Sequence, residues 1–404
     1  MKTKVLTSEI DEAASILQRG GLVAVPTETV YGLAGNGLSP EIIEKIYETK
    51  NRPTVKPISL MVAGKDAIPS LCEEVPAAAE ALAELFWPGP LTLVLKAKDQ
   101  IPESLRAGGE TVGLRCPRQE QTLRLLRRLE FPLAVPSANP SGEQSPKSAE
   151  QVLRYFDGKI DAVIDGGACD IGLESTVLDL SRTPFRILRQ GALPKEKIED
   201  ALADALQLVG ITGGSGCGKT SALDVFRRNG ALVIDADALY HQMLEENEVL
   251  LSELAEAFPA ALEDGKLNRR KLGPIVFSDP AALQRLNAIS HRHIGLAIRQ
   301  QLRSFAMDGG KLAVLDAIEL FGPGTENLHF DLTIAVTAPM EIRLARIMQR
   351  DKISEEEAKR RLLAQHPQEY FMEHCDISVR NDGDIDTFEN SIQTILEERL
   401  HGQH

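Results

Sequence analysis

The chain has 404 residues, of which 43% are hydrophobic and 26% are charged, with a formal net charge of −14. This length indicates two or three globular domains, and the acidic balance argues against non-specific nucleic-acid binding and favours small-molecule substrates. No apolar run approaches the ~18 residues of a membrane span, and the N-terminus lacks the apolar stretch of a signal peptide. We therefore expect a cytoplasmic protein without a membrane partner.

The positions of cysteine and histidine restrict the chemistry further. The five cysteines are odd in number, widely spaced and without a C-x-x-C pair, which predicts reduced thiols and argues against a disulfide framework or a zinc site. All eight histidines lie at or after His241. Catalysis in the first half therefore cannot use histidine as a base.

The first half mixes short apolar runs with amphipathic segments. Helices are predicted over residues 39–50 and 148–156, because each segment has helical spacing and begins with a serine that can cap it. Strands are predicted where apolar runs end at Gly, Pro or Ser, at residues 20–26, 91–97, 111–117, 131–137, 161–167 and 175–181. The pattern predicts an α+β domain with a twisted, mixed sheet over residues 1–205.

Basic and small polar residues of this half lie beside its predicted turns and strand ends. Arginine forks bind phosphate or carboxylate, and short side chains in turns allow a ligand to approach closely. A turn or cap would explain any one of these residues, whereas the whole set favours a site for a polyanion and a polar ligand. The set consists of Lys50, Arg52, Lys56, Arg115, Ser137, Asn139, Ser145, Ser175 and Arg189.

The order of motifs in this half resembles the YrdC-like threonylcarbamoyl-AMP synthase family over about residues 8–203. The matching stretches are "VPTETVYGL" (25–33), "KNRPTVKP" (50–57), "PSANPSGEQSP" (136–146) and "GLESTVLDL" (172–180). The resemblance implies that L-threonine, bicarbonate and ATP give threonylcarbamoyl-adenylate and pyrophosphate, with Mg²⁺ accompanying ATP. It also implies that the product serves tRNA modification, so we expect transient contact with the tRNA threonylcarbamoyl transferase machinery.

The same resemblance assigns ligand contacts residue by residue. Some family members carry a histidine where this chain has Met61. The threonine-side positions implied are Thr29, Arg115, Ser137 and Ser175. The ATP-side positions implied are Lys50, Arg52, Lys56, Thr111, Asn139, Ser145 and Arg189.

The second half alternates predicted strands and helices. A helix is expected over residues 194–206, and a buried strand follows directly, which places a domain boundary between residues 205 and 206. The strand candidates are residues 207–212, 231–236, 312–317 and 331–338. Helical segments between them predict a parallel sheet with right-handed crossovers over residues 206–404, and an α/β class overall.

A phosphate-binding loop opens this half. Residues 213–220, "GGSGCGKT", satisfy G-x-x-x-x-G-K-[ST] between a predicted strand and a predicted helix, the context that the motif requires. Backbone N–H groups of such a loop surround phosphates, Lys219 reaches the β/γ-phosphates, and the hydroxyl of Thr220 is a Mg²⁺ ligand. The predicted ATP contacts of the loop are Gly213, Ser215, Gly216, Cys217, Gly218, Lys219 and Thr220.

Three carboxylates and an arginine-rich segment follow the loop. Asp235 and Asp237 stand at the end of one strand and Asp316 at the end of another, where ligands bind in parallel sheets. Either a catalytic carboxylate or a helix cap would explain the first two. The segment 343–361 carries Arg343, Arg346, Arg350, Arg360 and Arg361, for which a surface salt-bridge face and a phosphate-binding lid both remain open.

Residues 207–404 resemble the dephospho-CoA kinase family. The matching stretches are "GITGGSGCGKT", "GALVIDADAL", "LGPIVFSDPAALQRLNAI", "RIMQRDKISEEEAKRRLLAQ" and "VRNDG". The resemblance implies transfer of phosphate from ATP to the 3′-hydroxyl of dephospho-CoA, with Asp237, Lys219 and Arg350 catalytic and Arg346 binding ATP. The chain departs from the family pattern at Arg292, where proline is usual, and at Gly322, where glutamate is usual.

Two other functions remain open at this stage. The first half could be an RNA-binding module rather than an enzyme, through a basic surface of Arg115, Arg118, Arg124, Arg127 and Arg128. The second half could be a small P-loop kinase of other or lost specificity.

Overall fold

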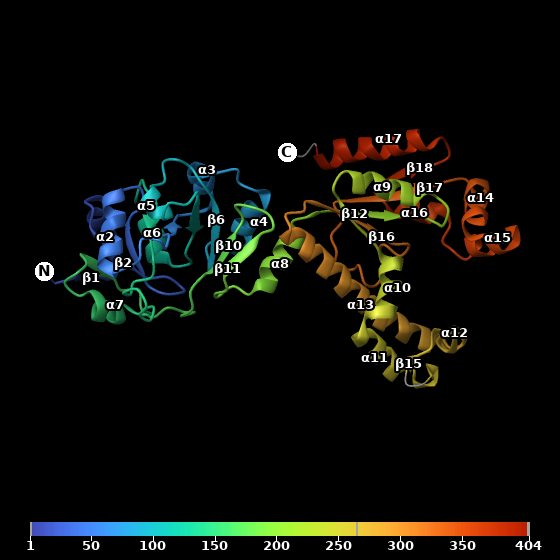
Figure 1. Ribbon diagram of the computed structural model, residues 1–404, viewed down its shortest axis with the longest axis horizontal. Helices are drawn as coiled ribbons and strands as arrows, with labels where there is room; N and C mark the ends of the chain where they lie inside the picture. The colour runs from blue at the N-terminus through green and yellow to red at the C-terminus, as the bar shows by residue number, and fades with distance from the viewer. Residues whose placement is uncertain (1, 264–265, 402–404) are drawn as a thin grey trace. The chain divides into compact units, whose positions relative to one another are not determined.

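The computed structural model describes residues 2–263 and 266–401. The chain divides into two compact units, residues 1–202 with 307–309, and residues 203–306 with 310–404. Figure 1 shows the elements of both units, which are described separately here.

The first unit is built on one mixed sheet. In the described residues its strands run in the order β1-β9-β2-β3-β8-β4-β7-β6-β10-β11, with β5 paired to β6. The pairs β1–β9, β2–β9, β4–β7 and β6–β10 are parallel, and the remaining pairs are antiparallel. The strands are β1 (Lys4–Leu6), β2 (Val23–Val25), β3 (Gly32–Asn36), β4 (Leu60–Met61), β5 (Cys72–Glu73), β6 (Leu91–Ala97), β7 (Thr111–Arg115), β8 (Leu133–Ala134), β9 (Ala162–Ile164), β10 (Thr176–Asp179) and β11 (Arg186–Arg189).

The helices of this part of the chain begin where the sequence offers caps. The side chain of Ser39 accepts from the backbone N–H of Ile42, and that of Ser148 from Gln151, which confirms the two predicted serine caps. The helices are α1 (Ile10–Gln18), α2 (Pro40–Lys50), η1 (Lys65–Ala67), α3 (Ile68–Leu71), α4 (Ala77–Phe86), α5 (Glu103–Arg106), α6 (Glu120–Arg127), α7 (Ala149–Phe156) and α8 (Lys195–Asp204).

A core joins the strands near the β1 edge of this sheet to helices α1 and α6. Ile16 and Leu17 of α1 and Leu125 of α6 are buried against Val23 of β2 and Ile164 of β9. Burial of such side chains is the main stabilising contribution to folding. The predicted α+β class and mixed sheet are confirmed.

The second unit contains a five-stranded parallel sheet in the order β13-β16-β12-β17-β18. The predicted parallel sheet is confirmed, although the edge strand β18 did not stand out in the sequence. The strands are β12 (Gln207–Thr212), β13 (Leu232–Asp235), β16 (Leu312–Asp316), β17 (Leu332–Thr337) and β18 (Ile377–Arg380), and a separate hairpin comprises β14 (Leu262–Glu263) and β15 (Lys266–Leu267).

Helices connect these parallel strands, as crossover connections require. The predicted boundary between residues 205 and 206 falls between α8 and β12. The helices are α9 (Lys219–Arg228), α10 (Ala236–Glu246), α11 (Glu248–Ala257), η2 (Pro259–Ala261), α12 (Arg269–Ser278), α13 (Pro280–Met307), α14 (Met340–Asp351), α15 (Glu355–Leu363), α16 (Gln368–His374), α17 (Ile385–Ile395) and η3 (Leu396–His401).

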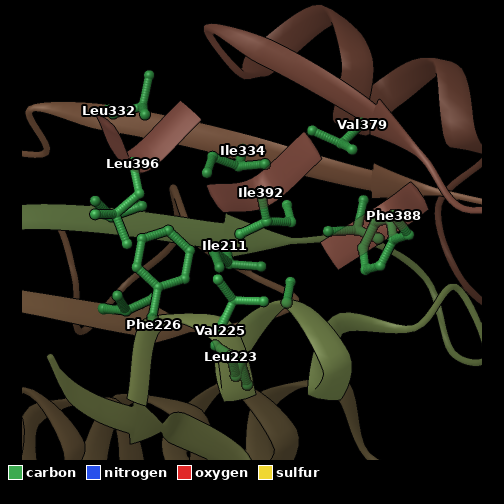
Figure 2. Packing of buried hydrophobic residues seen from close by; sticks show 14 of the residues in the cluster. Ile211, Leu223, Val225, Phe226, Leu332, Ile334, Val379, Phe388, Ile392 and Leu396 are labelled. Carbon is green, nitrogen blue, oxygen red and sulfur yellow. The ribbon is translucent and has the colours of Figure 1, made fainter. Parts of the chain in front are cut away.

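The core of the second unit lies between the parallel sheet and the helices α9 and α17. Figure 2 shows Phe226 of α9 and Ile392 of α17 packed near Ile211 of β12 and Ile334 of β17, and all four side chains are fully buried. This packing fixes the strand β12 and the start of α9, and therefore the loop that joins them. No helix in the described part of the chain is long and apolar enough to cross a membrane.

Candidate active sites

The first unit contains a cavity of about 350 Å³ that brings together six of the sequence-predicted ligand residues. These residues come from loops and strand ends that lie far apart in the sequence. They are Arg52, Thr111, Arg115, Ser137, Ser175 and Arg189. Met61 also lines the cavity, at the position where some family members carry a histidine.

Arg115 lines this cavity and is held by a buried acid. Its Nη2 atom donates to Oε1 of Glu28 and to Oγ1 of Thr29, both at 2.8 Å, and the Glu28 side chain is fully buried. Glu28 also accepts from the backbone N–H of Arg118 at 3.0 Å. Thr29 is buried and reaches the cavity only through Arg115. Arg115 is itself only 6% exposed, so it cannot belong to an exposed RNA-binding surface.

Arg189 and Glu174 form a second charged pair at this cavity. Arg189 donates to Glu174 and, through Nε and Nη2, to the backbone oxygen of Ser175 at 3.1 and 2.9 Å. The hydroxyl of Ser145 donates to Glu174 at 3.0 Å. The hydroxyl groups of Ser175 and Thr92 lie 2.9 Å apart. Ser145 therefore supports the cavity wall through Glu174.

Lys50 lies beneath the cavity. Its Nζ atom donates to the backbone oxygens of Ser137 and Asn139, and the residue is 1% exposed. Burial lowers the pKa of Lys50 to about 7. The amide nitrogen of Asn139 donates to the backbone oxygens of Pro140 and Glu143. Lys50 and Asn139 thus shape the loop that carries Ser137.

The loop after Lys50 presents one arginine to the cavity. Arg52 donates through Nε to the backbone oxygen of Lys56 at 3.2 Å and through Nη2 to that of Pro57 at 2.9 Å. The side chain of Lys56 is exposed and does not line the cavity. Among its predicted residues, the cavity therefore includes the guanidinium groups of Arg52, Arg115 and Arg189 and the small side chains of Ser137 and Ser175.

The P-loop of the second unit turns sharply between β12 and α9. Gly213, Gly216 and Gly218 have positive φ angles of 142°, 78° and 98°, which residues with a Cβ atom rarely adopt. A Cβ atom on Gly213 would lie 2.3 Å from the backbone oxygen of Val336. Glycine is therefore required for the conformation that surrounds phosphate with N–H groups.

Lys219 projects from the start of α9 toward the end of β16. Its Nζ atom donates to the backbone oxygen of Gly213 at 2.9 Å and lies 3.6 Å from Oδ1 of Asp316. Burial raises the pKa of Asp316 to about 6, the positive charge of Lys219 lowers it, and the charges of Asp235 and Asp237 raise it further. The three predicted carboxylates therefore belong to one site.

The two remaining aspartates have different surroundings. Asp235 lies opposite Asp316 in the sheet, and its side chain caps α10 by accepting from the backbone N–H of Ala238 at 2.9 Å. Asp237 lies in the first turn of α10 and is exposed. Asp235 is therefore a cap, whereas Asp237 has a free approach to a substrate.

Cys217 and Thr220 occupy contrasting positions in the loop. Cys217 is 1% exposed, and burial raises the pKa of its thiol. It is therefore a packed thiol rather than a reactive thiolate. Thr220, in the first turn of α9, is exposed and available as a hard oxygen donor. All five cysteines are free, as predicted.

The predicted arginines of α14 separate into two groups. Arg350 is 65% exposed and forms an ion pair with Asp351, whose carboxylate also binds Arg361. Arg346 points to the P-loop, where it donates to the backbone oxygens of Gly216 and Cys217 at 3.2 and 3.3 Å. The structure therefore places Arg346 on the backbone of the loop and leaves Arg350 at the surface.

The two departures from the family pattern lie outside the P-loop. Arg292 pairs with Glu253, which also accepts from Nε2 of His293 at 2.9 Å when that atom is protonated. Gly322 lies in a turn, where its N–H donates to the backbone oxygen of Glu319 at 3.1 Å. The Glu319 side chain is 62% exposed and lies 3.6 Å from His366.

Several residues that shape the two sites were not singled out in the sequence. Glu28, Glu174 and Asn381 each lie inside a matching stretch, "VPTETVYGL", "GLESTVLDL" and "VRNDG". Acidic residues are unexpected in a site for an anionic ligand, which is why composition gave no signal for Glu28 and Glu174. Within the described residues, no group of three or more His, Cys, Asp or Glu side chains could hold a metal ion on its own.

Comparison with known proteins assigns each half of the chain to a protein family. The family model Sua5_yciO_yrdC, described as Telomere recombination, matches residues 15–191, and the model CoaE, described as Dephospho-CoA kinase, matches residues 207–387. A putative threonylcarbamoyl-AMP synthase of Mycobacterium tuberculosis is 32% identical over 50% of this chain and 93% of its own length. A dephospho-CoA kinase of Anaeromyxobacter dehalogenans is 38% identical over 44% of this chain and 85% of its own.

The chain belongs to the Sua5/YrdC family through its first half and to the dephospho-CoA kinase family through its second half. A threonylcarbamoyl-AMP synthase of Pyrococcus abyssi is 46% identical over 192 residues, which are 48% of this chain and 56% of that protein. The chain thus spans about half the length of that relative. Both family resemblances deduced from the motifs are confirmed.

Proposed function

We propose that this chain is a bifunctional transferase, with a threonylcarbamoyl-AMP synthase in its first half and a dephospho-CoA kinase in its second. The observation that carries the synthase assignment is the convergence of three arginines and two serines on one cavity. For the kinase, it is the P-loop beside three carboxylates, of which Asp235 and Asp316 end β13 and β16 and Asp237 lies in the first turn of α10. The expected cytoplasmic location and the contact with the tRNA-modifying machinery belong to this proposal.

In the synthase half, L-threonine and bicarbonate combine into a carbamate with loss of water, and an oxygen of the carbamate attacks the α-phosphate of ATP while pyrophosphate leaves. No side-chain nucleophile is needed, which suits a half without histidine. Arg115 and Ser175 would bind the amino acid, and Arg52 and Arg189 would neutralise the phosphates. Catalysis then rests on positioning and on charge stabilisation in the transition state.

In the kinase half, Asp237 accepts the proton of the 3′-hydroxyl of dephospho-CoA while that oxygen attacks the γ-phosphate and ADP leaves. Lys219 and the P-loop N–H groups hold the β/γ-phosphates. Arg350, exposed on α14, would reach the transferring group once the ATP is bound.

The residues at the kinase site fit a Mg²⁺ ion that arrives with ATP. Mg²⁺ prefers oxygen ligands and in such sites uses one or two carboxylates together with substrate phosphates. The hydroxyl of Thr220 and the carboxylate of Asp316 are donors of this kind, and the shared electrostatics of Asp235, Asp237 and Asp316 favour a cation. When bound, the ion would neutralise charge on the phosphates.

The test is to incubate the intact chain with each substrate set separately. Threonine, bicarbonate and ATP should release pyrophosphate, and dephospho-CoA and ATP should release ADP. Release of neither product from folded protein would contradict the proposal. Retention of tRNA without pyrophosphate release would instead support the RNA-binding alternative for the first half.

A further inference from the structure

Three side chains outside the P-loop donate hydrogen bonds to three consecutive backbone carbonyl groups of the loop. The donors are Arg343 and Arg346 of α14 and Asn381, which follows β18. We name this set of three side chains the carbonyl clamp. The acceptors are the backbone oxygens of Ser215, Gly216 and Cys217.

Asn381 holds the Cys217 end of the loop. Its Nδ2 atom donates to the backbone oxygen of Cys217 at 2.9 Å, and its Oδ1 atom accepts from Nη2 of Arg346 at 3.2 Å. Its own backbone N–H donates to Thr337 of β17 at 2.8 Å, and the residue is 5% exposed. Asn381 thus connects the loop to the central sheet.

Arg343 secures the other end of the loop. Its Nε atom donates to the backbone oxygen of Ser215 at 2.9 Å, and the residue is 3% exposed. Gln365 assists, because its Oε1 atom accepts from the backbone N–H of Ser215 at 2.9 Å and its Nε2 atom donates to the Ser215 hydroxyl at 2.7 Å. A buried arginine on a backbone oxygen is a fixed donor rather than a mobile phosphate ligand.

The geometry of the peptide bond transmits these contacts to the opposite side of the loop. In a planar trans peptide, the C=O of one residue and the N–H of the next point in opposite directions. A donor that holds the carbonyls of Ser215, Gly216 and Cys217 therefore directs the N–H groups of Gly216, Cys217 and Gly218 away from itself. In a P-loop these N–H groups are the ones that surround phosphate.

The close packing at Gly218 agrees with this role. A Cβ atom at Gly218 would lie 2.0 Å from Nδ2 of Asn381, so the glycine leaves the space that the clamp occupies. A Cβ atom at Gly216 would likewise lie 2.7 Å from the backbone oxygen of Arg343. Gly218 thus leaves room for the Asn381 side chain of the carbonyl clamp, and Gly216 leaves room for the backbone of α14 at Arg343.

We infer that Arg343, Arg346 and Asn381 are positioning residues, which orient the phosphate-binding N–H groups through the backbone without touching the nucleotide. Arg346 then acts on ATP through the loop rather than as the direct ligand that the family resemblance implied. The inference rests on the proposed function only in taking the P-loop as a phosphate site. It requires no particular phosphoryl acceptor.

The experiment measures hydrogen exchange of the peptide spanning residues 213–220 in the intact chain during titration with ADP and, separately, with inorganic triphosphate. This readout is local, so nucleotide bound in the first unit does not enter it. The substitution Asn381→Ala removes one of the two donors to the backbone oxygen of Cys217 and leaves only Arg346, a loss that corresponds to roughly three- to tenfold in affinity. Exposed Asn390 on α17 provides the matched control, Asn390→Ala.

The inference predicts that Asn381→Ala speeds exchange of this peptide without ligand and raises the midpoint for both ligands by the same factor. A higher midpoint for ADP alone would show contact with the base or ribose and overturn it, as would unchanged midpoints. If Asn381→Ala also loosens the strand at residues 332–337, the variant Arg346→Lys tests the inference instead. It keeps the positive charge but loses the forked guanidinium group that contacts the loop. Weaker triphosphate binding by that variant supports the inference, and unchanged binding contradicts it.

Wild-type behaviour separates this inference from the proposed function. If ADP protects the loop but dephospho-CoA is not phosphorylated, the proposed kinase substrate is wrong and the inference about the carbonyl clamp still stands. If wild type, Asn381→Ala and Asn390→Ala show the same exchange of this peptide and the same midpoints, the inference about the carbonyl clamp is wrong and the proposed function still stands.

Discussion

The Nζ atom of Lys219 lies 3.6 Å from Oδ1 of Asp316, and the two side chains are only 15% and 12% exposed. This partly buried pair joins the P-loop to the end of β16. The cation offsets part of the cost of burying the carboxylate, yet the pKa of Asp316 is still raised from 3.8 to about 6. The pair has consequences for the pH dependence of stability.

Replacing Asp316 by asparagine should remove a pH-dependent loss of stability in the second unit. Because the pKa of Asp316 is higher in the folded state, the folded chain binds this proton more tightly, and stability falls as the pH rises from about 4 to about 6. A shift of this size corresponds to about 3 kcal/mol at most above pH 6. Amide exchange of β12 and β16 at pH 4.5 and 7 measures the effect. Equal pH dependence in wild type and variant would contradict it.

Replacing Lys50 by methionine should destabilise the first unit by about 1–3 kcal/mol, since the buried carbonyl of Asn139 loses its donor and that of Ser137 keeps only the N–H of Asn139. The single tryptophan, buried Trp87, reports unfolding of this unit in urea. Lys45→Met on the same helix is the control, because Lys45 forms a half-exposed ion pair worth less than about 1 kcal/mol. Similar stability of the two variants would show that Lys50 does not hold the Ser137 loop.

Replacing Arg52 by alanine should raise the KM for ATP in threonine-dependent pyrophosphate release about tenfold or more, with a much smaller effect on threonine. Arg52 supplies a guanidinium group to the cavity, and an ionised hydrogen bond contributes about 1.5–3 kcal/mol. Arg154→Ala, which breaks only a surface pair with Glu150, is the control. An equal loss for both substrates would indicate collapse of the loop instead.

Replacing Asp237 by asparagine should lower the kinase turnover at least about a hundredfold while ADP binding persists, the usual scale for loss of an acid–base group. Single-turnover phosphorylation of dephospho-CoA measures the step. Exposed Glu245 on the same helix supplies the control, Glu245→Gln. Turnover close to that of wild type would remove Asp237 from catalysis and direct attention to Asp316.

Much of the fold could be predicted because its signals are local. Strands such as β6 and β12 lie in mainly apolar runs, and Ser39 and Ser148 mark helix starts directly. The strand β3 contains two glycines, and β18 alternates polar residues at a sheet edge. Their pairing depends on tertiary neighbours, so these two strands were not predicted from local sequence.

In the two sites, too, features with a local sequence signal could be predicted and features that depend on tertiary contacts could not. The P-loop could be predicted because its backbone conformation requires glycine at fixed positions, as the positive φ angles of Gly216 and Gly218 show. The role of Asn381 could not, because it lies 164 residues from the Cys217 carbonyl that it binds. The motif predicted Lys50 as an ATP-side residue, whereas its burial against the loop that carries Ser137 depends on packing and had no local signal.

The central claim is that two separate active sites operate on one chain. The most direct measurement records pyrophosphate and ADP release by the intact chain and by two variants, Lys219→Ala and Arg189→Ala. The account predicts that Lys219→Ala abolishes dephospho-CoA-dependent ADP release and leaves threonine-dependent pyrophosphate release intact, and that Arg189→Ala does the reverse. Loss of both activities in either folded variant, or threonine-dependent pyrophosphate release that requires Lys219, would contradict it.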